Sequence, residues 1–276
     1  MKIKKLYSFK DKKQIWRLLI SGTDLLIIET RDMETRDVFF SCLDIHSGQK
    51  IFSNIQMEEK SWIGIDTIYK DIIFFHQYVK PDMPDHKKIT AFDIKLKKVL
   101  WQNDDFTFGF VTNDTVYAHI NTMVGQKYFP LHFKTGEIIS EEAVDSVELF
   151  ELRAKAESEK DYSNYKFPEI YNQRFAVNEN IRQYVEKATQ SAEVTGNIEY
   201  IENDNWLMMN YHNQISHENI KNEFIVFNKN KKKKIFSETL NKHAKAFVPD
   251  SFFLYKDILI LLKEKNEVII CKIFEK

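Results

Sequence analysis

Five aspartates recur ahead of apolar, strand-like segments, and regularly spaced carboxylates are natural candidates for acid–base chemistry. The five are Asp24, Asp71, Asp114, Asp204 and Asp257. An aspartate in a tight turn accepts hydrogen bonds from its own backbone, however, and equivalent positions of successive repeats cannot converge on one substrate. We therefore interpret all five as turn residues, and the sequence predicts no catalytic residue.

Two histidines and a glutamate at matching positions suggest a metal site. Glu29, His76 and His119 each lie five residues after one of the first three aspartates, and imidazole and carboxylate groups are common zinc ligands. Equivalent positions in neighbouring repeats point in the same direction rather than toward one ion. We expect hydrogen-bonded strand histidines here, and we predict no metal ion and no cofactor.

Three tryptophans and a run of four lysines could be either structural residues or parts of a binding site. Trp16, Trp62 and Trp101 fit the core aromatic positions of the repeats, and the alternative is a stacking platform for a sugar or a base. The run Lys231–Lys234 resembles a basic patch. Because it lies in a predicted turn, we expect a solvated turn and no nucleic-acid partner.

The elements that position these residues repeat along the chain. The aspartates are spaced by 47, 43, 90 and 53 residues, so the third interval spans two repeats. Each repeat contains strands A to D, with the aspartate in the A–B turn and a second tight turn between C and D. Four strands in about 45 residues are typical of a β-propeller blade. We predict an all-β propeller with five four-stranded blades; in the six-blade alternative, Asp161 marks a degenerate blade.

The two ends of the chain complement each other. The fifth repeat ends after strand C (268–274), and Lys4–Phe9 is similar to the outer D strands of earlier repeats, such as Lys50–Phe52. An N-terminal strand that completes the last blade would close the ring and remove its open edges.

Residues 141–193 do not fit a blade. The segments 148–160 and 178–188 have helical spacing of apolar residues, with Asn178 as a plausible cap for the second. We predict that residues 1–276 form a single propeller domain with a small helical insert at 141–193.

The second tight turn carries a family resemblance. In Asp44–Phe52, an aspartate after a strand is followed by Gly48 and then by an aromatic residue, and Thr135-Gly136 keeps the glycine. This pattern resembles the blades of quinoprotein-like and tryptophan–aspartate-repeat propellers. The chain also resembles a family of uncharacterised bacterial proteins with degenerate propeller repeats. The resemblance implies the fold but no activity, since that family has none assigned.

Composition excludes several classes of protein. The 276 residues are 43% hydrophobic, with a formal net charge of −1, which excludes a long disordered tail and gives no pull toward nucleic acid or anionic membrane. No apolar run reaches the length of a membrane span, and the basic start Met1–Lys5 is a poor secretory signal. Cys42 and Cys271 lie in apolar runs, so we expect buried thiols. We expect a cytoplasmic monomer.

The loops on one face of the predicted propeller are longer than those on the other. The B–C loops, 31–37, 79–88 and 213–222, are long and polar, and the insert joins the same face. Long loops on a rigid scaffold collect binding residues. We therefore predict a non-enzymatic binding module that presents this face to a protein partner. Its candidate residues are Arg31, Arg36, Asp82, His86, His217 and Tyr184.

The alternative is a carbohydrate-active enzyme or a sugar-binding protein that uses the mouth of the channel. Glycosidases need a pair of carboxylates about 5–9 Å apart. Asp66 and Asp250 lie in or beside A strands and could face the channel.

Overall fold

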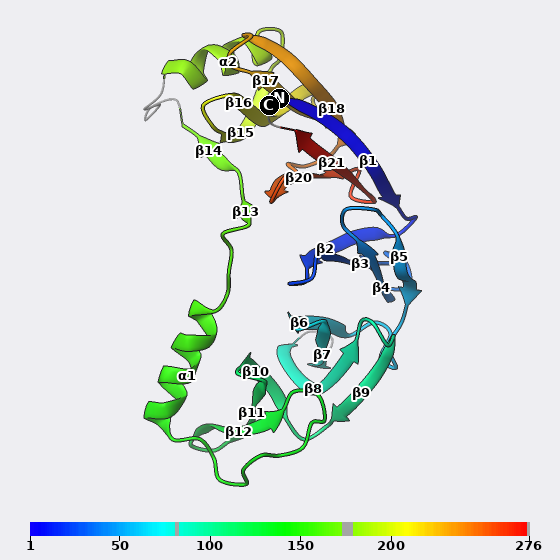
Figure 1. Ribbon diagram of the computed structural model, residues 1–276. Helices are drawn as coiled ribbons and strands as arrows, with labels where there is room; N and C mark the ends of the chain where they lie inside the picture. The colour runs from blue at the N-terminus through cyan, green and yellow to red at the C-terminus, as the bar shows by residue number, and fades with distance from the viewer. Residues whose placement is uncertain (81–82, 173–178, 275–276) are drawn as a thin grey trace. The chain divides into compact units, whose positions relative to one another are not determined.

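The computed structural model describes residues 1–80, 83–172 and 179–274 (Figure 1). The chain divides into two compact units. We call residues 13–161 the central unit, and residues 1–12 together with 162–276 the terminal unit.

The central unit contains three antiparallel sheets, in the orders β2-β3-β4-β5, β6-β7-β8-β9 and β10-β11-β12. Their strands are β2 (Gln14–Ile20), β3 (Leu25–Arg31), β4 (Val38–Asp44), β5 (Lys50–Ile55), β6 (Ile63–Tyr69), β7 (Ile72–Lys80), β8 (Met83–Asp93), β9 (Lys98–Asn103), β10 (Thr107–Thr112), β11 (Thr115–Thr122) and β12 (Gly125–His132). Helix α1 (Ser146–Ser158) follows, and the side chain of Asp145 caps it by accepting a hydrogen bond from the Val147 N–H.

The terminal unit contains two sheets, in the orders β14-β15-β16-β17-β18 and β1-β21-β20-β19-β13. Their strands are β1 (Lys2–Lys10), β13 (Tyr165–Lys166), β14 (Glu169–Tyr171), β15 (Val194–Glu202), β16 (Trp206–Ser216), β17 (Asn219–Asn228), β18 (Lys233–Ala244), β19 (Phe252–Tyr255), β20 (Ile258–Lys263) and β21 (Glu267–Phe274). Helix α2 (Glu179–Thr189) belongs to this unit.

The predicted pairing of the N-terminal strand with the last strand of the chain is confirmed. β1 pairs with β21 over its whole length, from Lys2 opposite Phe274 to Lys10 opposite Glu267. The last sheet is therefore completed by the first strand of the chain, and the edge of β21 is covered.

Turn residues at matching positions accept the same hydrogen bond in each sheet. A backbone N–H at or just after the end of the third strand donates to the carbonyl of the turn residue, which is an aspartate in four sheets and Asn205 in the sheet of β16. The pairs are Ile45 to Asp24, Ile94 to Asp71, Phe133 to Asp114, Lys229 to Asn205 and Ile273 to Asp257. Asp24, Asp71 and Asp114 have φ near +60°, a conformation that aspartate adopts more readily than most residues. The interpretation of these three as turn residues is confirmed.

Aromatic side chains pack between neighbouring sheets within each unit. In the central unit, Phe40 of the first sheet meets Phe75 of the second, with ring centroids 4.7 Å apart, and Phe74 stacks on Phe108 of the third at 5.4 Å. In the terminal unit, Phe224 contacts Phe252 at 4.9 Å. Burying each such ring contributes about 1.5–3 kcal/mol, so the contacts between sheets account for much of the core.

The all-β class is confirmed, and helices occur inside the predicted insert, at 146–158 and 179–189. The arrangement of the sheets as propeller blades and the single domain stay predictions. Neither helix among the described residues is long and apolar enough to span a membrane.

Three local expectations are corrected. The predicted loops 79–88 and 213–222 are mostly the ends of paired strands, because β7–β8 and β16–β17 continue as hairpins. The third sheet has three strands, since the predicted outer strand at Ile138 makes only an isolated bridge to Leu131.

Two phenylalanines on the β1–β21 pair allow a matched test of the closing strand. Phe9 of β1 is 6% exposed, whereas Phe274 of β21 is 43% exposed. Phe9→Ala should lower the free energy of unfolding by about 3 kcal/mol, because it leaves a cavity in the core. Phe274→Ala should cost less than about 1 kcal/mol. Urea unfolding of both variants measures the difference, and equal losses would contradict the buried position of β1.

Candidate functional site

The first strand of each central sheet is bulged, at the same level in the second and third sheets and two residues further from the turn in the first. The register shifts between Ile15 and Arg17, between Ile65 and Thr67, and between Phe108 and Phe110. The extra residues are Trp16, Asp66 and Gly109. A β-bulge re-aims a side chain and is common beside functional sites. Of these three bulges, that of the second sheet carries a carboxylate.

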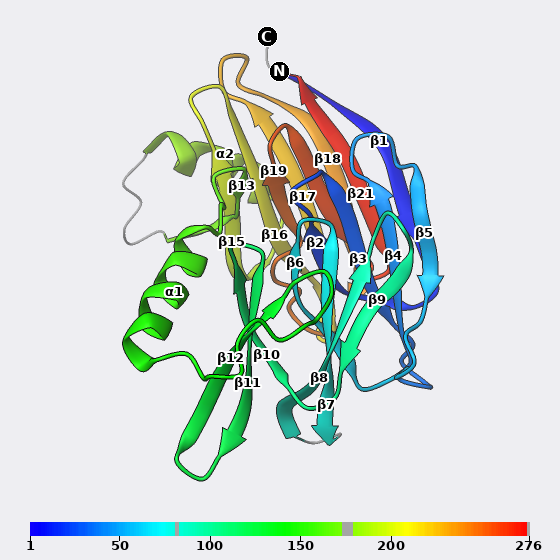
Figure 2. The same ribbon diagram turned by 60° about the horizontal axis from the view of Figure 1, so that its bottom comes forward.

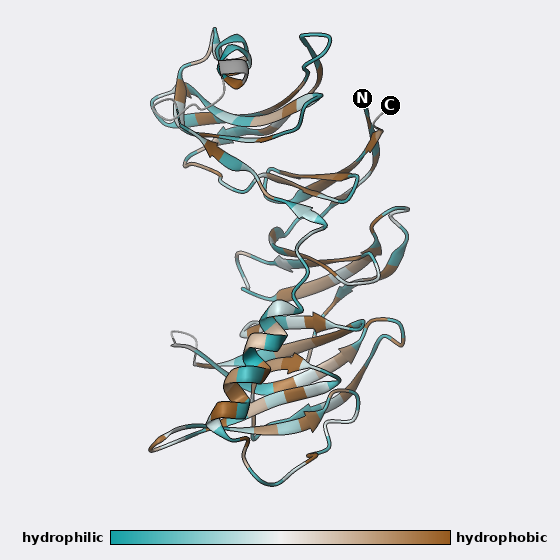
Figure 3. Cartoon of the chain, turned by 60° about the vertical axis from the view of Figure 1, so that its left-hand side comes forward, coloured by the Kyte–Doolittle hydropathy of each residue, from teal (hydrophilic) through white to brown (hydrophobic). Residues whose placement is uncertain are grey.

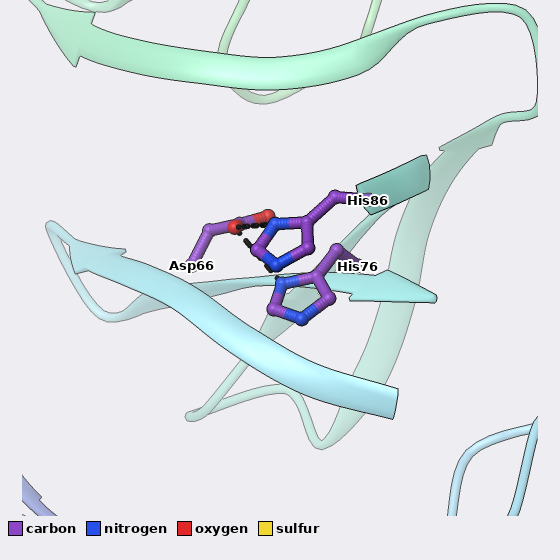
Figure 4. A group of neighbouring side chains, drawn as sticks. All are labelled: Asp66, His76 and His86. Carbon is purple, nitrogen blue, oxygen red and sulfur yellow. Dashed lines mark hydrogen bonds and ion pairs between the residues drawn. The ribbon is translucent and has the colours of Figure 1, made fainter. Parts of the chain in front are cut away.

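Two histidines converge on this carboxylate (Figure 4). Oδ1 of Asp66 lies 2.9 Å from Nδ1 of His76 in β7 and 3.1 Å from Nδ1 of His86 in β8. The two imidazole rings are stacked, with centroids 3.4 Å apart and planes 9° from parallel. Asp66, His76 and His86 form what we call the Asp–His–His cluster.

A second bulge brings His86 into the cluster. His76 pairs with Ile89, whereas Gln77 pairs with Lys87 and Tyr78 with His86, so Lys88 is an extra residue in β8. Side chains two residues apart on a strand share a face, so Tyr78 lies on the same face of the sheet as His76. His86 is the residue paired with Tyr78, and its side chain therefore lies on that face too. Without the bulge, Lys87 would take that place.

The bulge at Lys88 is itself anchored. Lys88 has φ +57°, and its ammonium group lies 3.4 Å from a carboxylate oxygen of Glu58 and 3.2 Å from one of Asp104. The hydroxyl of Thr107 in β10 donates to the carbonyl of His86 at 3.1 Å. The position of His86 therefore depends on contacts with both neighbouring segments.

The cluster is largely removed from water. The side chains of Asp66 and His76 are 9% and 3% exposed, whereas that of His86 is 34% exposed. Burial acts to raise the pKa of Asp66, but the hydrogen bonds from His76 and His86 outweigh it and hold the pKa below its usual value. Since an ionised carboxylate only accepts, both Nδ1 atoms carry the protons that they donate to Oδ1.

A glycine and a tyrosine enclose the cluster. A Cβ added to Gly64 of β6 would lie 2.7 Å from Nε2 of His76 and 3.5 Å from the hydroxyl of Tyr78. The Tyr78 ring meets the edges of His76 and His86, with centroids 4.9 and 5.4 Å apart. Gly64 thus provides the space in which His76 and Tyr78 lie side by side.

The donor set suits acid–base chemistry or metal binding. Asp66, His76 and His86 each offer one ligand atom, and these atoms lie within 4.8 Å of one another. It is the one group of three or more His, Cys, Asp or Glu side chains with this geometry in the described part of the chain. The set considered from the sequence, Glu29 with His76 and His119, is spread over β3, β7 and β11 of three different sheets.

The remaining predicted residues do not gather at this cluster. Arg31 donates to Glu29 Oε1 and lies over the ring of Trp16 at 4.4 Å. Arg36 is exposed in the turn after β3, and His217 is exposed in the β16–β17 turn of the other unit. Asp82 lies outside the described residues.

Tyr184 does not have the surface position that was expected of a binding-face residue. It is 5% exposed, its ring packs on Phe227 at 5.3 Å, and its hydroxyl donates to the Lys229 carbonyl. Ile181 and Val185 are buried with it. The apolar face of α2 therefore covers its own sheet.

The channel candidates Asp66 and Asp250 belong to different units, central and terminal. Asp66 accepts from two histidines, and the Asp250 backbone N–H donates to Glu199 at 3.4 Å.

The other residues considered from the sequence differ in burial, and Trp16 does not have the core position that was expected. Trp101 is buried and donates to the Phe133 carbonyl, whereas Trp16 is half exposed. Burial raises the pKa of Cys42 to about 12 and that of Cys271 to about 11, so both thiols stay protonated near neutral pH. The four lysines at 231–234 are exposed.

Residues 20–101 match a family model described as "Domain of unknown function (DUF4905)". The predicted resemblance to an uncharacterised family is confirmed. The matched segment contains the whole Asp–His–His cluster. No curated protein matches the chain.

Several solved structures are distantly similar. An uncharacterized protein from Listeria monocytogenes EGD-e is 14% identical, with 91% of this chain and 75% of that chain covered and a TM-score of 0.35. A europium-containing methanol dehydrogenase is 11% identical, with 95% of this chain and 52% of that chain covered and a TM-score of 0.32. An endo-arabinase from Bacteroides thetaiotaomicron VPI-5482 is 9% identical, with 99% of this chain and 97% of that chain covered and a TM-score of 0.27. None of these similarities is close enough to assign a function.

Replacing the central carboxylate should destabilise the protein. Asp66→Asn removes the charge that accepts both Nδ1–H groups in a buried setting, so the free energy of unfolding at pH 7 should fall by about 2–3 kcal/mol. The control is Asp24→Asn, since Asp24 makes a similar 3.1 Å contact with His46 at an exposed place and should lose less than about 1 kcal/mol. Equal losses in urea unfolding would show that the cluster is not a buried, charge-assisted group.

His119 predicts a pH dependence of stability. Burial, and then the charge of Arg153, lower its pKa in the folded protein, while the unfolded value is about 6.5. The unfolded state therefore binds the proton first, and stability falls as pH drops below about 6.5. His119→Gln should flatten the stability curve between about pH 7 and pH 5. The exposed control His217→Gln should leave its shape unchanged, and an unaltered slope in His119→Gln would be the contradictory result.

Proposed function

We propose that this protein is a non-enzymatic binding module, built as a five-bladed β-propeller, whose B–C hairpins and segment 141–193 contact a protein partner. The B–C hairpins are those between β3 and β4, β7 and β8, β11 and β12, and β16 and β17.

The observation that carries the proposal is where large apolar side chains are exposed. Of sixteen such side chains among the described residues, ten lie on these hairpins or in segment 141–193. They are Met33, Val79, Met123, Val124, Val147, Phe150, Tyr162, Phe167, Ile170 and Ile215. Single exposed apolar residues are ordinary, and we take the concentration of these on the hairpins and in segment 141–193 of each unit as support for the proposed contact.

The β11–β12 hairpin gives the sharpest example (Figure 2). Met123 and Val124 form its tip, and both are almost fully solvent-exposed. The strands pair without a register shift up to Thr122 opposite Gly125, so the tip is held by a regular ladder. Two adjacent apolar side chains at such a tip suit insertion into a partner's pocket.

Helix α1 carries a second pair of exposed apolar side chains in the same unit. It is held on the third sheet by Arg153, whose guanidinium lies over the Tyr128 ring at 4.7 Å, and Ala156 is buried beneath it. Val147 and Phe150, three residues apart, remain exposed, and Figure 3 shows polar and apolar residues mixed along the helix.

The five antiparallel sheets support the number of blades, and the pairing of β1 with β21 supports ring closure. The alternative, a carbohydrate-active or sugar-binding protein, depends on the carboxylates of Asp66 and Asp250. No specific observation within the described residues favours it.

Site-specific photo-crosslinking tests the proposal. A photoreactive residue at position 124 or 150 of the full-length chain should give a covalent adduct with one protein in cells that naturally express it. The same residue at Leu96, an equally apolar and 60% exposed position in a C–D turn, should give none. The double variant Met123→Ser/Val124→Ser should reduce capture of that partner at least about fivefold, which corresponds to about 1 kcal/mol.

Deleting 141–193 would be a poor test, since it would uncover the sheet beneath α2. Equal crosslinking at positions 96, 124 and 150, or no adduct at any of them, would contradict the proposed contact surface.

A further inference from the structure

We propose that Asp66, His76 and His86 bind one divalent transition-metal ion of the zinc class, through the Asp66 carboxylate and Nδ1 of both histidines. The proposal does not rest on the partner contact proposed above, although His76 and His86 belong to the β7–β8 hairpin.

The separations of the donor atoms fit such an ion. Zinc binds nitrogen and oxygen at about 2.0–2.1 Å, so ligand atoms of a tetrahedral site lie about 3.4 Å apart. The two Nδ1 atoms are already 2.9 and 3.1 Å from Oδ1 of Asp66. The two rings are stacked with centroids 3.4 Å apart and planes 9° from parallel. Because the Nδ1 lone pairs lie in the ring planes, both rings must also tilt toward the ion, and His86, which is one-third exposed, has room to do so.

Hydrogen bonding alone leaves the cluster incompletely satisfied. Both Nδ1–H groups share a single oxygen, while Oδ2 of Asp66 and Nε2 of His76 are buried without a hydrogen-bond partner. An unsatisfied buried polar atom is costly, and native proteins keep few of them. Of these two atoms, Oδ2 of Asp66 belongs to the carboxylate that would hold an ion, and its lack of a partner points to a missing ligand.

The ligand atom of His76 is set by its surroundings. Nε2 is buried and lies beside Gly64, where an added Cβ would be 2.7 Å away, so that nitrogen is not open to an ion from solvent. Nδ1 faces the carboxylate instead. When Nδ1 binds the ion, the imidazole proton moves to Nε2, and the neutral ring keeps its total of one N–H proton.

Tyr78 becomes a positioning residue in this arrangement. Its hydroxyl lies near Gly64 on the side of His76 Nε2. The two groups make no hydrogen bond in this structure, so the hydroxyl accepts the new Nε2–H only once metal binding brings the two together. Such outer partners of a ligating histidine fix the ring orientation, and their loss typically lowers metal affinity by about 10–100-fold.

The donor types narrow the class of ion. Two imidazoles and one carboxylate suit Zn²⁺, Fe²⁺ and related ions, whereas sites for Ca²⁺ and Mg²⁺ use oxygen ligands. Three protein ligands leave a fourth tetrahedral position open. His86, which is one-third exposed, gives the ion a route from solvent.

Zinc titration by calorimetry tests the site. The chain has eight histidines, so surface binding must be separated from the cluster. Full-length protein, freed of metal with a chelator and carrying no affinity tag, should bind one Zn²⁺ ion saturably. His86→Ala should weaken this binding at least about 100-fold, and Tyr78→Phe about 10–100-fold. His119→Gln and His46→Gln, which change histidines outside the cluster, should bind Zn²⁺ like the unaltered protein.

A second metal separates loss of the site from loss of the fold. Co²⁺ should give a visible d–d absorption band with the unaltered protein and not with His86→Ala, whose circular dichroism should stay unchanged because His86 is partly exposed. Absence of saturable Zn²⁺ binding, or equal affinity in His86→Ala, overturns the proposal. Unchanged affinity in Tyr78→Phe overturns the positioning role of Tyr78.

Discussion

Local departures from regular pairing position the side chains of the candidate site. A regular strand alternates its side chains between two faces, and here both faces of the inner strands are buried. β3, for example, is buried from Leu25 to Thr30. A polar residue in such a strand is removed from solvent and needs partners within the protein, and for His76 two bulges supply them. Asp66 and His86 meet at His76 because β6 gains one residue and β8 gains Lys88. Without those two extra residues, His76 would be an isolated buried imidazole.

Much of the fold could be predicted from the sequence because its signals are local. Asp24, Asp71 and Asp114 mark turns that require a positive φ, and apolar runs such as Ile72–Phe75 mark inner strands. The match of Lys4–Phe9 to the outer strands predicted its pairing with β21, because outer strands share one pattern. What local signals could not give was the extent of the hairpins. The segments 79–88 and 213–222 are polar, and polarity predicts a loop unless cross-strand pairing is known.

That error also hid the candidate site. His86 was assigned to a loop and Asp66 to a channel, and His76 was compared with histidines at equivalent positions of other repeats. The cluster forms between strands of one sheet rather than between repeats, so comparing residues at equivalent positions of different repeats could not find it. A usable signal was present in the residues. Tyr78 and His86 are separated by a segment short enough for a hairpin, and alternation from His76 places Tyr78 on the same face. The bulge at Lys88, which decides whether His86 or Lys87 faces inward, has no recognisable sequence signal.

The central claim is that the register of β7 and β8 builds a three-ligand site from Asp66, His76 and His86. The most direct measurement is a crystal structure of the full-length protein grown with Zn²⁺, with anomalous data collected at the zinc edge. The account predicts one strong anomalous peak about 2.0–2.2 Å from an Asp66 oxygen and from Nδ1 of both histidines. A structure in which the His86 side chain points away from Asp66, or in which the cluster stays hydrogen-bonded with no peak beside it, would contradict the account.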